Sequence, residues 1–356
     1  MNESESATSA DPVPYISVVL VFHTRLNFLS LALTSILEQT LPGDQFEVLV
    51  VGPKRPEGLV DRPSSPLVRF VECAEAELGN KIAAGIRRSQ GEVIAFLEDD
   101  DLFEPDKLSF VRDAFLSDSN LAYLQNGYRT IDERGRWISR KGPDERAMER
   151  WARRGKVLIS GRPTDSELRQ FSHIPAGFNN SSIAVRRRLV RPHLPLLESV
   201  DTLVDVTLLY GALVQRCHLC LDPRPLTRLR KHASSNSDPR STSELDQLSR
   251  LRAFSQAARS RRRLLLEFVR ENGSPAVVRA IEGQWAINEI FLNLRDSRYR
   301  FSDRARSLLN GLRRVRTFEE QNYILAIPLA ALVILTGRFG PRLYIRVRRR
   351  FYLQTQ

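Results

Sequence analysis

The first hundred residues alternate short apolar runs with segments of helical periodicity. The apolar runs are of strand length, rich in β-branched residues, and occupy Ile16 to Phe22, Phe46 to Val51, Val68 to Val71 and Glu92 to Leu97. Such runs predict strands that are buried on both faces, as in a parallel sheet. Between them, residues 27–39 and 82–89 place apolar side chains three and four positions apart, which predicts covering helices. The alternation therefore predicts an α/β fold with an open, mostly parallel sheet and helices on both faces.

Further strand patterns and a polar break divide the rest of the chain. Residues 122–131, 181–185 and 218–229 are strand-like, and 203–213 is an apolar helix. A Ser-rich loop at 233–245 then marks a domain boundary. We expect four parts, which are a disordered leader (1–13), an α/β domain (14–235), an Arg-rich helical region (236–320) and an apolar segment followed by basic residues (321–356).

Charge is distributed unevenly along the 356 residues. The formal net charge is +12, yet residues 1–115 carry a net −9 and residues 248–356 a net +14. A basic end suits an anionic partner such as nucleic acid or a phospholipid surface. The tail has no basic stripe interleaved with aromatics and no zinc-finger or RRM-like motif, so nucleic acid is the less favoured partner. Three cysteines without a secretory pattern suit a reducing cytoplasm.

The last part of the chain predicts contact with a membrane. Tyr323 to Gly337 is uncharged and almost wholly apolar, and six arginines follow it. The stretch is shorter than the roughly 20 residues of a spanning helix and contains Pro328, so it is either an interfacial or re-entrant segment or a buried core helix. The arginines favour the anionic cytoplasmic leaflet. We expect a peripheral or monotopic protein on that face.

Four consecutive acidic residues, Glu98 to Asp101, follow the strand at 92–97. Ligands of open α/β sheets bind outside the carboxyl ends of the strands, which is where this run is expected. Like charges so close repel unless a cation relieves them, and oxygen ligands suit Mg²⁺ or Mn²⁺. The alternative is an acidic cluster that caps the helix opened by Pro105.

The surrounding residues favour the metal site over the helix cap. Residues 96–108 read FLEDDDLFEPDKL and resemble the family 2 glycosyltransferases of GT-A fold, in which a strand ends in FLDxDD and PxKL follows. The resemblance implies a metal-dependent transferase with a nucleotide-sugar donor. It implies that Asp100 binds the metal, that Glu98 contacts the ribose or belongs to the metal shell, and that Asp99 lies at the donor. Glu98 stands in place of the family's first Asp.

Other family landmarks occur in the same order. Arg25 follows the first strand, Lys81 lies ahead of the acidic run, and Arg230 and His232 end the PLTRLRKH segment. By resemblance, His232 completes the metal shell or contacts the diphosphate. Lys81, Arg230 and Lys54 would stabilise the leaving nucleotide. The family usually has a pair of Asp after the second strand, whereas this chain has Gly52, Pro53 and Lys54, so the sequence does not predict the base.

The family inverts the anomeric centre with one carboxylate as general base, which should lie well after the acidic run. Asp201 and Asp205 are the candidates, and Asp201 is favoured because Gly211 then falls where a family glycine often does. Many relatives use lipid-linked acceptors, so we expect a glycan or lipid-linked acceptor. The competing interpretation is a non-catalytic nucleotide-sugar-binding or scaffolding protein on the same fold, because fold alone does not establish activity.

Overall fold

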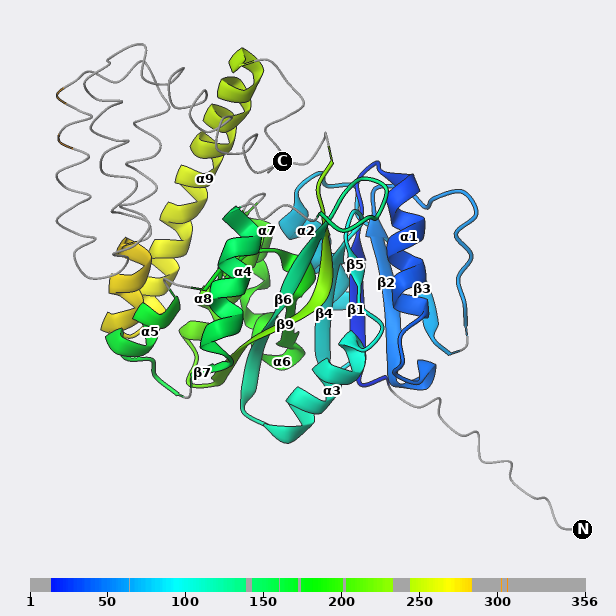
Figure 1. Ribbon diagram of the computed structural model, residues 1–356, viewed down its shortest axis with the longest axis horizontal. Coiled ribbons are helices and arrows are strands. Elements are labelled where there is room, and N and C mark those ends of the chain that lie inside the picture. The colour runs from blue at the N-terminus through cyan, green and yellow to red at the C-terminus, as the bar shows by residue number, and fades with distance from the viewer. Residues whose placement is uncertain are drawn as a thin grey trace, which may run out of the picture.

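The computed structural model describes residues 14–63, 65–138, 143–159, 161–171, 174–200, 203–232 and 244–283, together with Ser302 and Arg306. These residues form an α/β sandwich with a long helix beside it (Figure 1). The predicted leader at 1–13, residues 233–243 of the predicted boundary loop, and the apolar and basic segment at 321–356 lie outside the described residues. The last two residues of that loop, 244–245, are instead helical.

A nine-stranded mixed sheet forms the centre of the described fold. Its strands are β1 (Ile16–Val21), β2 (Phe46–Gly52), β3 (Leu67–Glu72), β4 (Val93–Glu98), β5 (Leu102–Phe103), β6 (Leu121–Ile131), β7 (Val157–Ile159), β8 (Ile183–Arg186) and β9 (His218–Arg230). Their order is β3-β2-β1-β4-β8-β6-β9-β5, with β7 paired to β9. Strands β3, β2, β1 and β4 are parallel, β8 is antiparallel to β4 and β6, and β6 is parallel to β9. The predicted α/β fold is confirmed, but the sheet is mixed, because β8, β5 and β7 each pair antiparallel with their neighbours.

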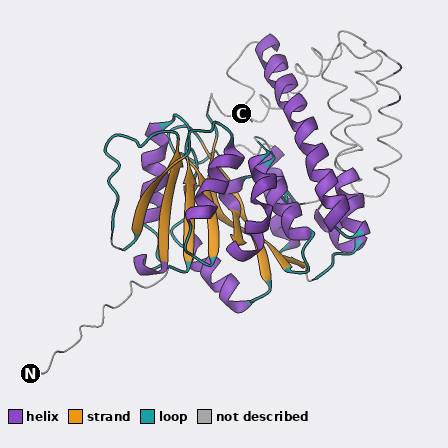
Figure 2. Cartoon of the chain, turned by 180° about the vertical axis from the view of Figure 1, so that it is seen from behind, coloured by secondary structure: helices purple, strands orange, loops and turns teal. Residues whose placement is uncertain are grey.

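Helices cover both faces of this sheet (Figure 2). They are α1 (Leu26–Leu37), α2 (Leu78–Arg88), α3 (Lys107–Ser117), α4 (Pro143–Arg154), α5 (Asp165–Phe171), α6 (Arg187–Val190), α7 (Leu194–Glu198), α8 (Val204–Leu213) and α9 (Glu244–Asn272), with short 3₁₀ turns η1 (Gly43–Gln45), η2 (Asn180–Ser182) and η3 (Arg191–His193). Successive strand side chains point to opposite faces. Val18 of β1 therefore joins a core with α1 and α3, and Val19 joins a core with α2, α7 and α8.

Close packing fixes the position of α2, which carries Lys81. A Cβ atom on Gly79 would lie 1.9 Å from the carbonyl oxygen of Leu197 and 2.2 Å from that of Val200. Only a residue without a side chain allows α2 to approach α7 this closely. The packing holds the first turn of α2 at the edge of the sheet where β1 and β4 end.

The long helix α9 packs its apolar face on the sandwich through Leu265 and Val269, which are buried with residues of α8. No helix within the described ranges is long and apolar enough to cross a membrane. The segment at 323–337, on which the membrane prediction depends, lies outside those ranges.

Candidate active site

The acidic run lies at the edge of the sheet where β1 and β4 both end. Glu98 is the last residue of β4 and is opposite Val21, the last residue of β1. Asp99 and Asp101 have only 1% and 3% of their surface exposed, while Glu98 and Asp100 are half-buried. Four carboxyl groups in so little water raise each other's pKa unless cations or N–H groups bind them. The partners of each carboxyl group therefore indicate which of them are charged and which could bind a cation.

Arg25, at the start of α1, bridges two of these carboxylates. Its Nη1 donates to Asp100 Oδ2 at 2.7 Å and its Nη2 donates to Asp99 Oδ1 at 2.5 Å. The backbone N–H of His23 donates to the second oxygen of Asp99 at 3.3 Å. One guanidinium thus supplies positive charge within hydrogen-bond distance of both side chains.

His232 reaches the same carboxylate from the end of β9. Its Nε2 lies 2.9 Å from Asp100 Oδ2 and 3.2 Å from Arg25 Nη1, and its ring centroid lies 5.2 Å from that of Phe28. Burial alone would raise the pKa of Asp100, but the hydrogen bond with His232 and the charge of Arg25 hold that pKa below its usual value. Asp100 is therefore anionic at neutral pH, as a metal ligand must be.

Asp101 and Arg230 fix the acidic turn to β9. Asp101 Oδ1 accepts the backbone N–H of Arg230 at 2.9 Å. The Arg230 side chain donates from Nε to the carbonyl oxygen of Asp100 at 2.8 Å, and from Nη1 to the carbonyl oxygens of Asp132 and Glu133 at 3.2 and 3.0 Å. These contacts hold Arg230 against the acidic turn, and its role in stabilising the leaving nucleotide stays a prediction.

A buried lysine, Lys107, is linked to the acidic turn by hydrogen bonds through Ser181. Lys107 is fully buried, and its Nζ donates to the carbonyl oxygen of Ser181 and, at 3.1 Å, to Thr227 Oγ1. Ser181 Oγ in turn accepts the backbone N–H of Glu98 at 3.1 Å. Burial holds the pKa of Lys107 well below its usual value, although the charge of Asp101 opposes this. The last residue of β4, η2 and β9 are thereby joined by one polar network.

The turn η2 joins the acidic run to Asp205. Asn180 Nδ2 donates to Glu98 Oε1 at 2.9 Å, and the N–H of Asn179 donates to Asp205 Oδ2 at 3.0 Å. The other Asp205 oxygen accepts the N–H of Val206 at 2.8 Å, in the first turn of α8. Two adjacent residues thus bind two carboxyl groups that are far apart in the sequence.

Burial raises the pKa of both of these carboxyl groups. The pKa of Glu98 rises to about 7, by burial first and then by the charge of Asp100, and Asp205 adds to the shift. The pKa of Asp205 rises to about 6, also by burial. A carboxyl group with a pKa near neutrality is suited to accept a proton during a reaction.

The family match covers most of this constellation. Residues 17–188 match the family model described as glycosyl transferase family 2. This segment belongs to glycosyltransferase family 2. It contains β1 to β8 with the acidic run, whereas Asp205 and His232 come after it.

Curated relatives of the family 2 segment are proteins of Rickettsia. An "uncharacterized glycosyltransferase" of Rickettsia bellii is 29% identical over 132 residues, which is 35% of this chain and 18% of that protein. One from Rickettsia felis is 27% identical over 127 residues, 35% of this chain and 21% of that protein. The chain spans about a fifth of the length of the curated relatives it matches.

Solved structures are similar to this chain at low sequence identity. Mannosyltransferase PcManGT from Pyrobaculum calidifontis, in complex with GDP-Man and Mn²⁺, is 14% identical, with a TM-score of 0.52 over 98% of this chain and 90% of that chain. S. aureus TarS 1-349, in complex with UDP-GlcNAc, is 12% identical, with a TM-score of 0.48 over 85% of this chain and 89% of that chain. The fold around the family 2 segment is GT-A.

Three further residues were predicted from the sequence to belong to the site, and of the two that the structure describes, only Lys81 lies beside the acidic run. Lys81 is buried, its Nζ lies 2.5 Å from His23 Nδ1, and burial lowers its pKa while the charge of Asp99 opposes the shift. Lys54 is exposed in the turn after β2, away from the contacts described above. Asp201 lies outside the described residues. The site thus brings together Arg25, Lys81, the acidic run, Asp205 and His232.

A divalent cation fits the chemistry of this family 2 site with few protein ligands. Within the described ranges, no three His, Cys, Asp or Glu side chains converge as a metal cage. Asp100 and His232 nevertheless lie 2.9 Å apart and provide one carboxylate oxygen and one imidazole nitrogen. Mg²⁺ and Mn²⁺ are commonly held by one or two protein groups plus water and substrate phosphates. The donor set therefore fits a cation that arrives with a nucleotide diphosphate.

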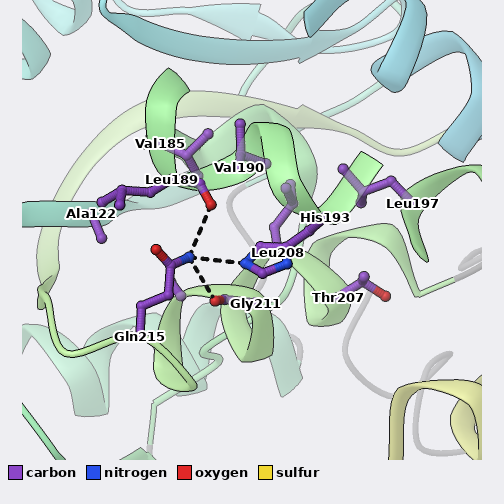
Figure 3. A pocket seen from close by; sticks show the side chains of 11 residues that line it. Ala122, Val185, Leu189, Val190, His193, Leu197, Thr207, Leu208, Gly211 and Gln215 are labelled. Carbon is purple, nitrogen blue, oxygen red and sulfur yellow. Dashed lines mark hydrogen bonds between the residues drawn. The ribbon is translucent and has the colours of Figure 1, made fainter. Parts of the chain in front are cut away.

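A hollow elsewhere in the molecule does not suit the donor (Figure 3). It is lined mainly by residues of α6 to α8, together with Ala122 of β6 and Val185 of β8. Its space of only about 10 Å³ holds no more than one water. Gln215 Nε2 donates to the carbonyl oxygens of Leu189 and Gly211 at 2.9 and 3.0 Å and lies 3.0 Å from His193 Nε2. This site is filled by its own side chains.

Proposed function

We propose that this chain is a glycosyltransferase that moves a sugar from a nucleotide-sugar donor to an acceptor hydroxyl with inversion, using Mg²⁺ or Mn²⁺. The observation that carries the proposal is the contact of Asp100 with both Arg25 and His232 at the end of β4, inside a family 2 segment. It brings an anionic ligand, an imidazole and a fixed positive charge to the edge where ligands of α/β sheets bind.

The cation, when bound by Asp100 and His232, would neutralise charge on the diphosphate as the sugar leaves. The chain itself supplies further positive charge from Arg25 and from Lys81, which is held near Asp99. Such groups act strongly because they are already in place and partly shielded from water. Arg230 also positions the acidic turn, since its Nε and Nη1 donate to the carbonyl oxygens of Asp100 and Asp132.

Asp205 is the general base in this proposal. Two backbone N–H groups orient its carboxylate, and its raised pKa of about 6 leaves it mostly deprotonated at pH 7 but basic enough to take a proton. Its interaction with Glu98 supports a position beside the donor. Asp201 remains the second candidate.

Donor binding tests the proposal. We expect one member of a panel of UDP-, GDP- and dTDP-sugars, together with Mn²⁺, to raise the melting temperature by about 5 °C or more at about 100 times its dissociation constant. EDTA should remove the effect, and the free sugar should not produce it. A panel without any stabilising member would contradict the proposal. Stabilisation without hydrolysis or transfer would support the non-catalytic binding protein instead.

We propose further that the acceptor is a glycan or lipid-linked glycan and that the chain works at the cytoplasmic face of a membrane. The support is the apolar stretch at 323–337 and the arginines after it, each adding about 1 kcal/mol at an anionic surface. The full chain should sediment with membranes at low salt, and a variant that ends before Gln321 should stay in solution and still bind the donor. Full-length protein in the soluble fraction at low salt, without detergent, would refute membrane association.

A further inference from the structure

The loop before η2 is held rigidly by a buried glutamine. Gln125 of β6 is fully buried, and its Nε2 donates to the carbonyl oxygens of Pro175 and Phe178 at 2.8 and 3.2 Å. Its Oε1 accepts the N–H of Gly177 at 2.9 Å and the hydroxyl of Tyr123 at 3.0 Å. One side chain thus uses both ends of its amide to fix residues 175–178, which we call the arch.

The two residues that follow the arch each bind a carboxyl group of the site. Asn179 donates its N–H to Asp205 and adopts a left-handed φ of 70°. Asn180 donates its side-chain amide to Glu98. A backbone in this sparsely populated region persists only where surrounding contacts impose it. The arch is therefore a fixed part of the site.

The arch exposes an aromatic ring at this position. Phe178 has 38% of its surface exposed, more than any other phenylalanine whose side chain the structure describes. Its ring centroid lies 5.8 Å from that of Tyr128, which is buried behind it. Residues that bind ligands are often carried by loops that a scaffold positions, and an aromatic ring there offers an apolar face to a ligand. Phe178 is also next to the residue whose N–H binds the proposed base.

A second observation at the arch points to a ligand with a hydroxyl group. Asn180 is buried, and its Oδ1 has no hydrogen-bond partner, although its Nδ2 is bound to Glu98. A buried acceptor without a donor costs about 1–3 kcal/mol. A hydroxyl that enters beside Glu98 would supply the missing donor.

We propose that the arch is the acceptor subsite and that Phe178 is the platform on which a pyranose ring of the acceptor stacks. This inference rests on the proposed function and specifies the chemical class of its acceptor. The C–H face of a sugar ring is apolar and packs on an aromatic face, while its hydroxyls need polar partners at the rim. In this proposal the sugar ring packs on Phe178, and one of its hydroxyls donates to Asn180. Asp205 accepts the proton of the hydroxyl that reacts.

Saturation-transfer NMR on the full chain with Mg²⁺ and UDP or GDP tests this subsite. The probes are the methyl glycosides of glucose, mannose, galactose and N-acetylglucosamine. We expect at least one of them to receive saturation on its ring protons and Phe178→Ala to reduce that signal about fivefold. Phe178→Tyr, which keeps the ring, should retain it. Leu116→Ala is the matched control, because Leu116 is 62% exposed near the opposite edge of the sheet, where α3 leads into β6.

Donor-induced stabilisation, measured on the same samples, separates this inference from the proposed function. It should be unchanged in Phe178→Ala, since the exposed ring contributes little to the core. Equal glycoside signals in the parent and Phe178→Ala, or no signal from any glycoside on the parent, would overturn the subsite. So would a loss of donor binding in Phe178→Ala, which would place the ring at the donor. Glycoside binding without donor binding would leave the subsite standing and refute the proposed function.

Discussion

Asp100→Ala is expected to abolish donor binding that depends on Mn²⁺ and to lower sugar transfer at least about 1000-fold. The change removes the carboxylate that contacts both Arg25 and His232. Loss of a cation at a developing charge costs several kcal/mol of transition-state stabilisation, and each 1.36 kcal/mol is about tenfold in rate. Titration calorimetry of the donor with and without Mn²⁺, together with single-turnover transfer, measures both effects.

A matched variant shows whether the effect is specific. Asp113→Ala on α3 also removes an aspartate, but this one is largely exposed and pairs only with its neighbour Arg112 among the contacts described. It should bind the donor and transfer the sugar as the parent does, because exposed ion pairs contribute little. Retention of more than about a tenth of the activity in Asp100→Ala would refute the role of Asp100 as a catalytic metal ligand.

Asp205→Asn should lose transfer by about 10²- to 10⁴-fold while the donor still binds, because it removes a proton acceptor and no metal ligand. The amide cannot accept both N–H groups that now bind the carboxylate, from Asn179 and Val206, so a small loss of stability should accompany it. Thermal melting with the donor and a transfer assay separate these contributions.

The pH dependence of transfer gives a second measure of the same residue. The base acts when deprotonated, so the rate should rise as the pH passes upward through about 6, the raised pKa of Asp205. Glu98 and Tyr123 are the titratable groups that interact with it. If Asp201→Asn is inactive and Asp205→Asn retains transfer, the base is Asp201.

Local patterns made much of the fold predictable. The run from Ile16 to Phe22 differs from β1 by one residue, and the acidic run lies at the end of β4 as its position in the sequence implied. Burial on both faces leaves a continuous apolar run, which composition alone reveals. The family resemblance also assigned Arg25 to the donor site and His232 to the metal site with Asp100.

Contacts between distant segments could not be predicted in this way. The sequence shows that Arg230 is basic, but its partners are carbonyl oxygens, which leave no trace in side-chain identity. Gln125 lies inside the strand-like run at 122–131. The alternation of apolar and polar residues does not show that this polar side chain is buried. Asp205 became a stronger candidate only through the N–H of Asn179, 26 residues earlier in the chain.

The place of β9 in the sheet sets the order in which this site can form during synthesis. β5 follows the acidic run directly, yet it pairs with β9, and Glu104 beside it binds Arg228, 124 residues further along. Pairings between such distant segments form slowly because a long loop must close first. During synthesis, the parallel strands β1 to β4 can pair before Arg230 has been added to the chain. Until then, Asp101 of the acidic run lacks its hydrogen bond to β9. Among the strands that the structure describes, the last one made is therefore the one that fixes the edge carrying the acidic run.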